Sequence, residues 1–245
     1  MKTIKIRVLS ELPTDFTGVV EYGNGAKVWY RNGKYHREDG PAVEDADGSK
    51  HWYLNGQRHR VDGPAVEDAY GSKHWYLNGQ RHRVDGPAVE WADGTKEWWL
   101  NGQYHREDGP AREGADGQKE WWLNNQRHRE YGPAWEYPDG EKLWYRNGKL
   151  HRVDGPAWER ADGEKRWFLN GQRHRVDGPA NEGADGSKQW YLNGRYIYQL
   201  LEPIRDYILI EDGLPSEVEW LGEQVTQRKL LTATGFMYIP NLPGI

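Results

Sequence analysis

Aromatic and polar positions alternate in short stretches that recur along the middle of the chain. The stretch that begins with Trp52 starts again at Trp75, 23 residues later, with almost the same order of apolar and polar residues. The leading tryptophan keeps this interval throughout, at Trp29, Trp52, Trp75, Trp98, Trp121, Trp144, Trp167 and Trp190. A fixed period without insertions predicts seven full repeats with partial ends, stacked regularly over residues 17–194.

Each repeat predicts one antiparallel β-hairpin. Two alternating segments flank a dipeptide that is Asp-Gly in most repeats, as at Asp93-Gly94. Asp-Gly favours a two-residue turn in which both residues have positive φ. The register that follows from such a turn pairs Val66 with Trp75 and Glu67 with His74.

A second turn, at Asn78-Gly79, leads into residues 80–84, and two arrangements of this segment fit the turn spacing. A plain connection leaves two strands per repeat and keeps equivalent segments at one edge, whereas a third short strand alternates the edges. We favour the plain connection. The expected fold is all-β, an elongated single-sheet array of antiparallel hairpins. In the fifth repeat Asn125 replaces the turn glycine, and asparagine tolerates the positive φ of such a turn.

Residues 1–16 and 195–245 fall outside the period and predict end caps, because an open stack must cover its terminal repeats. Alternation over residues 3–8 predicts an N-terminal capping strand. In the tail, residues 207–210 predict a strand, and residues 216–225, with a serine as N-cap, predict a short helix. We therefore expect a small mixed C-terminal cap. A separate functional module in the tail is the alternative.

The composition changes this picture in one respect. A mean hydropathy of −1.04 is typical of disordered chains, yet the sequence contains 14 Trp and 15 Tyr against 3 Phe and 2 Met. Amphipathic aromatic side chains are therefore expected to form the apolar contacts. The absence of cysteine excludes disulfides and thiolate metal sites, and a net charge of −5 argues against a nucleic-acid partner. Neither a membrane span nor a secretory signal is expected, which favours a cytoplasmic location.

The period, the aromatic hairpins and the Asn-Gly and Asp-Gly turns resemble those of membrane occupation and recognition nexus (MORN) repeats. The repeat pattern Trp-Tyr-X-Asn-Gly-X-X-His-Arg-X-Asp-Gly-Pro-Ala-X-Glu is similar to a variant type found in bacterial and phage proteins. The resemblance covers about residues 17–194 and implies an elongated antiparallel sheet with a binding or scaffolding role. Some members are associated with lipid, but this chain lacks the basic face that anionic lipid demands.

One histidine recurs in every repeat, at His36, His59, His82, His105, His128, His151 and His174. Equivalent atoms of successive repeats are expected about 10 Å apart, because each repeat adds two strands. A zinc ion needs ligand atoms about 2 Å away, so one ion cannot bridge two of these histidines. We interpret them as structural hydrogen-bonding groups and expect neither a metal nor a cofactor.

An arginine after each histidine and a glutamate seven residues later recur in every full repeat, as in Arg60 and Glu67. They predict a ladder of Arg–Glu contacts along the stack. A charged edge that binds an extended anionic ligand is the alternative, which the glutamates and the negative net charge oppose. No unique nucleophile stands beside a histidine, and a catalytic residue repeated seven times is implausible, so no enzyme is expected.

Two columns that vary between repeats supply the candidate site. They lie two residues apart and share a face, and in the third to sixth repeats they contain Trp, Tyr and Arg, the types enriched at interaction hot spots. The candidate partner-binding residues are Trp91, Arg112, Trp135, Tyr137, Trp158 and Arg160. In the predicted register Trp135 faces Trp144, and Trp158 faces Trp167. The alternative is that these side chains fill the inside of a tightly curled sheet.

Two functions fit this sequence. The first is a non-enzymatic protein that binds a protein partner through the Trp/Arg-rich face, and the resemblance suggests a phage protein that occupies or inhibits a host factor. The second is a carbohydrate or cell-wall binder that stacks sugar rings on exposed tryptophans, since Gly-Ser-Lys-His-Trp-Tyr-Leu-Asn faintly resembles choline-binding repeats. The sequence does not identify the partner or the oligomeric state.

Overall fold

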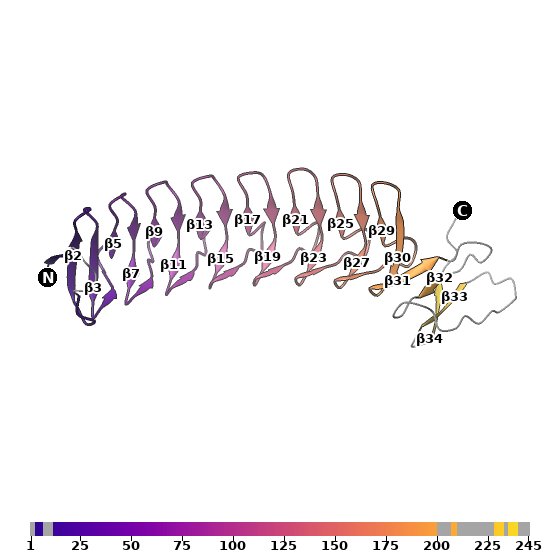
Figure 1. Ribbon diagram of the computed structural model, residues 1–245, viewed down its shortest axis with the longest axis horizontal. Coiled ribbons are helices and arrows are strands. Elements are labelled where there is room, and N and C mark those ends of the chain that lie inside the picture. The colour runs from indigo at the N-terminus through magenta and orange to yellow at the C-terminus, as the bar shows by residue number, and fades with distance from the viewer. Residues whose placement is uncertain (1–2, 7–11, 200–206, 210–227, 233–234, 240–245) are drawn as a thin grey trace. The chain divides into compact units, whose positions relative to one another are not determined.

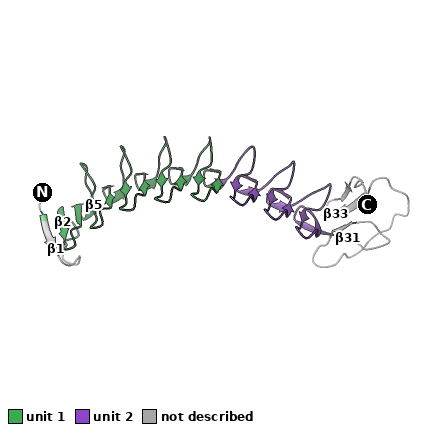
Figure 2. Cartoon of the chain, turned by 90° about the horizontal axis from the view of Figure 1, so that it is seen from above, with its two compact units in different colours: residues 1–126 green, residues 127–245 purple. Residues whose placement is uncertain are grey.

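The computed structural model describes residues 3–6, 12–199, 207–209, 228–232 and 235–239. All regular secondary structure in these ranges consists of β-strands (Figure 1). Contacts divide the chain into two compact units, residues 1–126 and 127–245 (Figure 2), with the division inside β20 (Gln126–Arg127). The prediction of an all-β array of consecutive antiparallel hairpins is confirmed in each unit.

The first unit begins with the predicted N-terminal strand. This strand, β1 (Thr3–Ile6), runs parallel to β2 (Gly18–Tyr22), which continues antiparallel into β3 (Lys27–Arg31) and β4 (Lys34–Tyr35). Beside these strands lies a small apolar cluster of Phe16, Val20, Val28 and Tyr30. It caps the first repeat with a small core of aliphatic and aromatic side chains.

The repeats of the first unit add two strands each to one antiparallel sheet. Its order after β3 is β5 (Val43–Glu44), β6 (Lys50–His51), β9 (Val66–Glu67), β10 (Lys73–His74), β13 (Val89–Glu90), β14 (Lys96–Glu97), β17 (Arg112–Glu113) and β18 (Lys119–Glu120). Between these pairs lie separate small hairpins: β7 (Tyr53–Leu54) with β8 (Gln57–Arg58), β11 (Tyr76–Leu77) with β12 (Gln80–Arg81), and β15 (Trp99–Leu100) with β16 (Gln103–Tyr104); β19 (Trp122–Leu123) precedes β20.

The second unit repeats the same plan. Its sheet contains β21 (Trp135–Glu136), β22 (Lys142–Leu143), β25 (Trp158–Glu159), β26 (Lys165–Arg166), β29 (Asn181–Glu182) and β30 (Lys188–Leu192). The small hairpins are β23 (Tyr145–Arg146) with β24 (Lys149–Leu150), and β27 (Phe168–Leu169) with β28 (Gln172–Arg173). The tail adds β31 (Arg195–Gln199), β32 (Tyr207–Leu209), β33 (Arg228–Thr232) and β34 (Gly235–Ile239).

The tail predictions have different outcomes. The strand expected over residues 207–210 is present as β32, which pairs with β31. The expected helix over residues 216–225 lies outside the described residues.

The predicted hairpin register is wrong by one residue. Val66 lies opposite His74 and Glu67 opposite Lys73. The reason is the turn: Asp68 N–H donates to the Ser72 carbonyl, which leaves three residues in the loop. Only the loop glycine has positive φ, 101° at Gly71. This is a type I turn with a glycine bulge instead of the two-residue turn expected for Asp-Gly. The shift places Val66, His74 and Tyr76 on one face and Glu67, Lys73 and Trp75 on the other.

The preference against a third strand is also wrong. Asn78 (φ 50°) and Gly79 (φ 79°) form a two-residue turn of type I′, which joins β11 to the short strand β12. This hairpin stays separate from the main sheet, so the sheet still gains two strands per repeat. Within each unit the Asp-Gly loops and the Asn-Gly turns lie at opposite edges (Figure 1). In the fifth repeat Asn125 holds a φ of 63°, as predicted.

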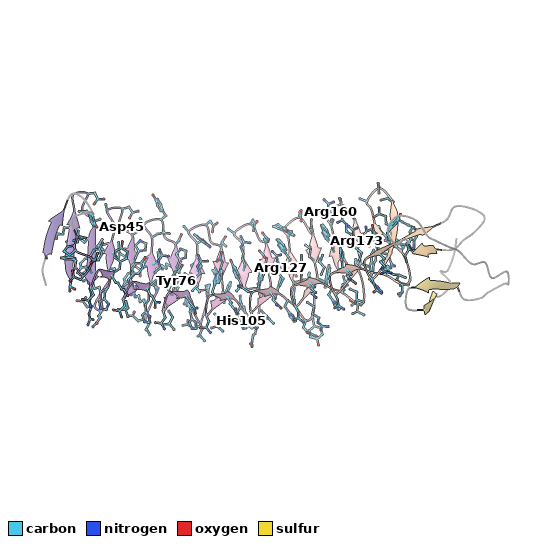
Figure 3. All side chains as sticks on the ribbon, turned by 60° about the horizontal axis from the view of Figure 1, so that its bottom comes forward. Asp45, Tyr76, His105, Arg127, Arg160 and Arg173 are labelled. Carbon is cyan, nitrogen blue, oxygen red and sulfur yellow. The ribbon has the colours of Figure 1, made fainter. Side chains whose placement is uncertain are left out.

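The recurring histidine ties each repeat to the next. Nδ1 of His82 contacts Asn101 twice, over 2.9 Å to the side-chain Oδ1 and over 3.3 Å to the backbone N–H, and the His82 backbone N–H donates to the Trp75 carbonyl over 3.1 Å. Equivalent bonds of 3.1–3.4 Å link the other pairs: Asn55 to His36, Asn78 to His59, Asn124 to His105 (Figure 3), Asn147 to His128, Asn170 to His151 and Asn193 to His174. The interpretation of these histidines as structural hydrogen-bonding groups is confirmed.

Replacing His82 with leucine should destabilise the first unit. The Asn101 N–H would lose its acceptor within the protein, and a typical intramolecular hydrogen bond contributes about 0.5–1.5 kcal/mol net. Urea unfolding followed by tryptophan fluorescence measures this loss, and hydrogen exchange should show faster opening at the Asn101 amide. Val84→Ser in the same repeat changes an exposed side chain and should stay within about 0.5 kcal/mol of the unaltered protein. Equal stability of His82→Leu and Val84→Ser would show that the histidine bond is unimportant.

Candidate binding surfaces

In six of the seven repeats an arginine is clamped between an aromatic ring and two carboxylates. The Arg83 guanidinium lies 4.1 Å from the Trp75 ring centroid. Its Nε donates to Asp85 over 3.1 Å, and its Nη1 donates to Glu90 over 3.1 Å and to the Pro87 carbonyl over 3.2 Å. The ring contact recurs at 3.9–4.1 Å for Arg37, Arg60, Arg106, Arg152 and Arg175. The predicted Arg–Glu ladder is therefore confirmed, with a tryptophan face added to it.

The glycine of the Asp-Gly-Pro segment makes room for this clamp. A Cβ added to Gly109 would lie 2.8 Å from Cζ of Arg106, so any side chain would displace the guanidinium. The sequence Arg-X-Asp-Gly-Pro-Ala, which six of the seven repeats share, therefore has a local explanation. In the fifth repeat Tyr131 replaces the aspartate, and Arg129 keeps its bonds to Glu136 (2.8 Å) and to the Pro133 carbonyl (2.9 Å).

The aspartate is the outermost member of each clamp. Asp85 is 85% exposed, whereas its partner Arg83 is 23% exposed. The side-chain hydrogen bond from Arg83 holds the pKa of Asp85 below its usual value, and the equivalent bonds lower the pKa of Asp39, Asp108 and Asp154. Each clamp contains one cation and two carboxylates, and the aspartate is the more exposed of the two carboxylates.

The opposite face of the first unit contains a second ladder of rings and guanidinium groups. Arg58 lies between two tyrosines, 5.9 Å from the Tyr53 centroid and 5.4 Å from the Tyr76 centroid (Figure 3). One repeat further, Trp99 stacks on Tyr104 with centroids 3.7 Å apart. Burial, followed by the charge of nearby Glu97, raises the pKa of Tyr104. Aromatic contacts thus continue from repeat to repeat on this face.

Two of the predicted site residues, Trp91 and Arg112, belong to this ladder in the first unit. Trp91 donates from Nε1 to Glu97 over 3.1 Å and packs edge-on against His74, with centroids 4.9 Å apart. Arg112 lies directly opposite Glu97 in the sheet and donates to Glu120 over 3.4 Å. Glu97 and Glu120 are buried, 7% and 6% exposed. Both predicted residues therefore serve as partners of buried carboxylates.

The other four predicted residues lie in the second unit. Trp135 stacks on Tyr137 with centroids 4.7 Å apart, and the Arg127 guanidinium covers Trp135 at 3.7 Å. Trp158 donates from Nε1 to Glu141 over 2.8 Å. Arg160 is exposed and bonds to Glu164 over 2.9 Å (Figure 3).

The expected tryptophan pairs do not form. Trp135 lies opposite Leu143, and Trp158 lies opposite Arg166, because the three-residue loop shifts the register. Arg166 covers the Trp158 ring at 4.3 Å. Except for Trp91, which is 39% exposed, every tryptophan within residues 12–197 is half-buried. The variable columns thus contribute much of their surface to contacts inside the protein.

A surface that the sequence analysis missed lies beside the arginine clamps. The residue between the arginine and the aspartate is exposed: Val61 and Val84 are each 83% exposed, Val153 is 81% exposed and Val176 is 51% exposed. Valine at such positions makes almost no contact within the chain. The sequence contains a signal for this column, because it has valine in four repeats and glutamate in three, whereas the preceding arginine is constant.

A groove separates successive clamp segments at the start of the first unit. It has a volume of about 620 Å³, and Asp39, Trp52, Leu54, Val61 and Asp62 contribute to its lining. The lining combines apolar residues such as Trp52 and Leu54 with the carboxylates and the clamp arginines Arg37 and Arg60. The groove is therefore shaped by the same segment that carries the exposed valines.

No group of three metal-ligating side chains occurs among the residues that the structure describes. In that same part of the chain, no helix is long and apolar enough to cross a membrane. Comparison with protein-family models and with curated proteins finds no match for the chain.

Arg83→Lys should lower the free energy of unfolding by about 1–2 kcal/mol, although it keeps the charge. Lysine lacks the planar fork that stacks on Trp75 while it bonds two carboxylates, and both kinds of contact are worth about 0.5–1 kcal/mol or more. Urea unfolding measures the change. Lys73→Arg, a charge-conserving change at an exposed sheet position, is the control. A stability of Arg83→Lys equal to that of the control would contradict the clamp.

The clamp also predicts a pH dependence. Because the folded pKa of Asp85 lies below its unfolded value, the aspartate stabilises the fold above about pH 4, and this contribution is lost as the pH falls through the folded pKa. The stability difference between the protein and its Asp85→Asn variant should stay constant from neutral pH to about pH 5 and shrink below about pH 4. Urea titrations at several pH values test this, and a difference that does not change with pH would contradict it.

Proposed function

We propose that the chain is a non-enzymatic repeat protein that binds a protein partner through side chains repeated along its surface. One observation carries the proposal: Val61, Val84 and Val153 are more than four-fifths exposed at equivalent positions of different repeats. An isolated exposed valine needs no explanation, but its recurrence beside a rigid clamp forms a periodic apolar surface, and such surfaces are typical of interaction sites.

The chemistry of the repeats supports binding over catalysis. The polar side chains of the clamps and of the histidine bonds recur from repeat to repeat and are already paired inside the protein. Solenoid repeats commonly use extended surfaces of this kind for recognition. The resemblance to MORN repeats of the bacterial and phage type supports the same class, and it motivates the finer proposal of a phage protein that occupies a host factor.

The Trp/Arg-rich columns remain a second proposed surface. Trp91 and Arg160 reach the solvent, whereas Trp135 and Trp158 are half-buried beneath arginine side chains. Carbohydrate binding gains less support, because sugar stacking requires an open indole face.

Capture experiments separate these surfaces. The intact protein, Val61→Ser/Val84→Ser and Trp135→Ala/Trp158→Ala are each used as bait in lysate from the cell type that contains the protein, and crosslinked partners are identified by mass spectrometry. We expect the valine pair to lose the partner without a change in thermal unfolding, because exposed valines contribute little stability. The tryptophan pair should mainly lower stability, by about 3 kcal/mol or more.

Retention of the same partner by the valine variant would exclude the clamp surface. Loss of the partner by the tryptophan variant at unchanged stability would favour the Trp/Arg face. Binding in a glycan array, together with no specific protein in any capture, would favour the carbohydrate function and contradict the proposal.

A further inference from the structure

We infer that the clamp surface of the first unit recognises an extended protein segment of the polyproline II type with a cationic side chain at every third residue. This inference rests on the proposed function and specifies its partner. The surface consists of Val61 and Val84 together with the outer aspartates of the clamps, Asp39, Asp62, Asp85 and Asp108.

Exposed apolar side chains form one part of this surface. Val61 and Val84 are each 83% exposed and occupy equivalent positions of successive repeats. Each directly precedes a clamp aspartate, so apolar and acidic side chains alternate along the row. The groove between the first two segments has Trp52 and Leu54 in its lining. A partner must therefore offer apolar surface between its polar contacts.

The exposed aspartates indicate that the polar groups of the partner are cationic. The four aspartates are each 85% exposed. Arg83 bonds Oδ1 of Asp85, and its positive charge is shared between Asp85 and Glu90. One negative charge per clamp thus stays uncompensated within the clamp. Glu38 and Glu107 replace valine in the flanking repeats. Glu38 (73% exposed) is paired with Arg31 over 3.1 Å, whereas Glu107 (85% exposed) lies 3.6 Å from His105 and adds a further carboxylate to the row.

The spacing of the clamp aspartates indicates which conformation the partner has. Each repeat adds two strands to the sheet, so equivalent aspartates lie about 10 Å apart. A polyproline II helix has three residues per turn and a rise of about 3.1 Å per residue, so residues i and i+3 point the same way about 9 Å apart. A β-strand would alternate the direction of residues i and i+3. Four aspartates therefore match a segment of about ten residues.

The clamp arginines hold the aspartates in fixed positions, so the spacing of the aspartates can discriminate between partners. Every aspartate is fixed by the Nε of an arginine that itself stacks on a tryptophan, with bonds of 2.9–3.1 Å at Arg37, Arg60, Arg83 and Arg106. A preorganised row and a stiff partner lose little conformational entropy on binding. Single exposed ion pairs are weak, so selectivity must come from their simultaneous formation.

Synthetic peptides test the register on the full-length protein. The probe is a fluorescent decapeptide with lysine at positions one, four, seven and ten and proline elsewhere. The comparison peptide has the same composition with its four lysines contiguous. Fluorescence anisotropy at low ionic strength should show about tenfold tighter binding of the spaced peptide, and added salt should weaken it.

Matched variants locate the site. Asp62→Asn/Asp85→Asn should weaken binding of the spaced peptide about fivefold or more, because two of the four ion pairs lose their charge. Asp47→Asn/Asp93→Asn removes the same charge from the Asp-Gly loops, where an amide oxygen can still accept the loop N–H bonds, and should change binding less than about twofold.

The outcomes separate this inference from the proposed function. Equal affinity for both peptides, or equal effects of the two aspartate pairs, would overturn the three-residue register. If neither peptide binds while capture of a protein still depends on Val61 and Val84, the register is overturned and the proposed function stands. If capture is also independent of these valines, both the three-residue register and the proposed function are contradicted.

Discussion

The clamp of each arginine between a tryptophan face and two carboxylates is the interaction on which the structure depends. The repeats form a main sheet without helices to cover it in the described residues, so the usual aliphatic core is missing. A guanidinium can cover an indole ring because it is planar and weakly hydrated along its faces. The carboxylates neutralise it while it is more than three-quarters buried, as for Arg83. A charged side chain therefore takes the place of an apolar layer.

The second constraint is that each repeat contacts only its neighbours. The histidine of one repeat accepts the turn N–H of the next, and in the first unit Ser72 Oγ accepts the Ala92 N–H of the following loop over 3.1 Å. Thr95 does the same for Ala115. Stability in such an array is approximately a sum of repeat terms and nearest-neighbour terms. That explains why the clamp and histidine positions recur almost unchanged, since every interface needs its own copy.

Much of this plan could be predicted from the sequence. The period gave the repeats, the Asn-Gly dipeptides gave type I′ turns, and the recurrence of Arg60, Glu67 and His59 indicated structural roles that the contacts confirm. The register could not be predicted in the same way. Asp-Gly fits both a two-residue turn and the last two positions of a three-residue loop, and the choice reverses the faces of one strand relative to the other.

That single ambiguity also explains the errors at the candidate site. With the two-residue turn, Trp135 would face Trp144; with the observed loop it faces Leu143 and is covered by Arg127. The contacts of Trp91 with Glu97, and of Arg112 with Glu120, depend on neighbouring strands and on side-chain rotamers. Neither is specified by the spacing within one repeat, so variation in a column could not be assigned to packing or to recognition.

Burial distinguishes variable columns whose side chains take part in internal packing from variable columns whose side chains face the solvent. Where Val89 varies to Arg112 in the next repeat, the first side chain is fully buried and the second bonds a buried carboxylate, so the change alters internal packing. Where Val84 varies to Glu107, both side chains are more than four-fifths exposed, so the internal structure is hardly affected. Selection for folding acts on the first kind of column. The second kind is free to be shaped by whatever contacts the surface, and for that reason we propose the exposed valines, more than the tryptophans, as the place where a partner binds.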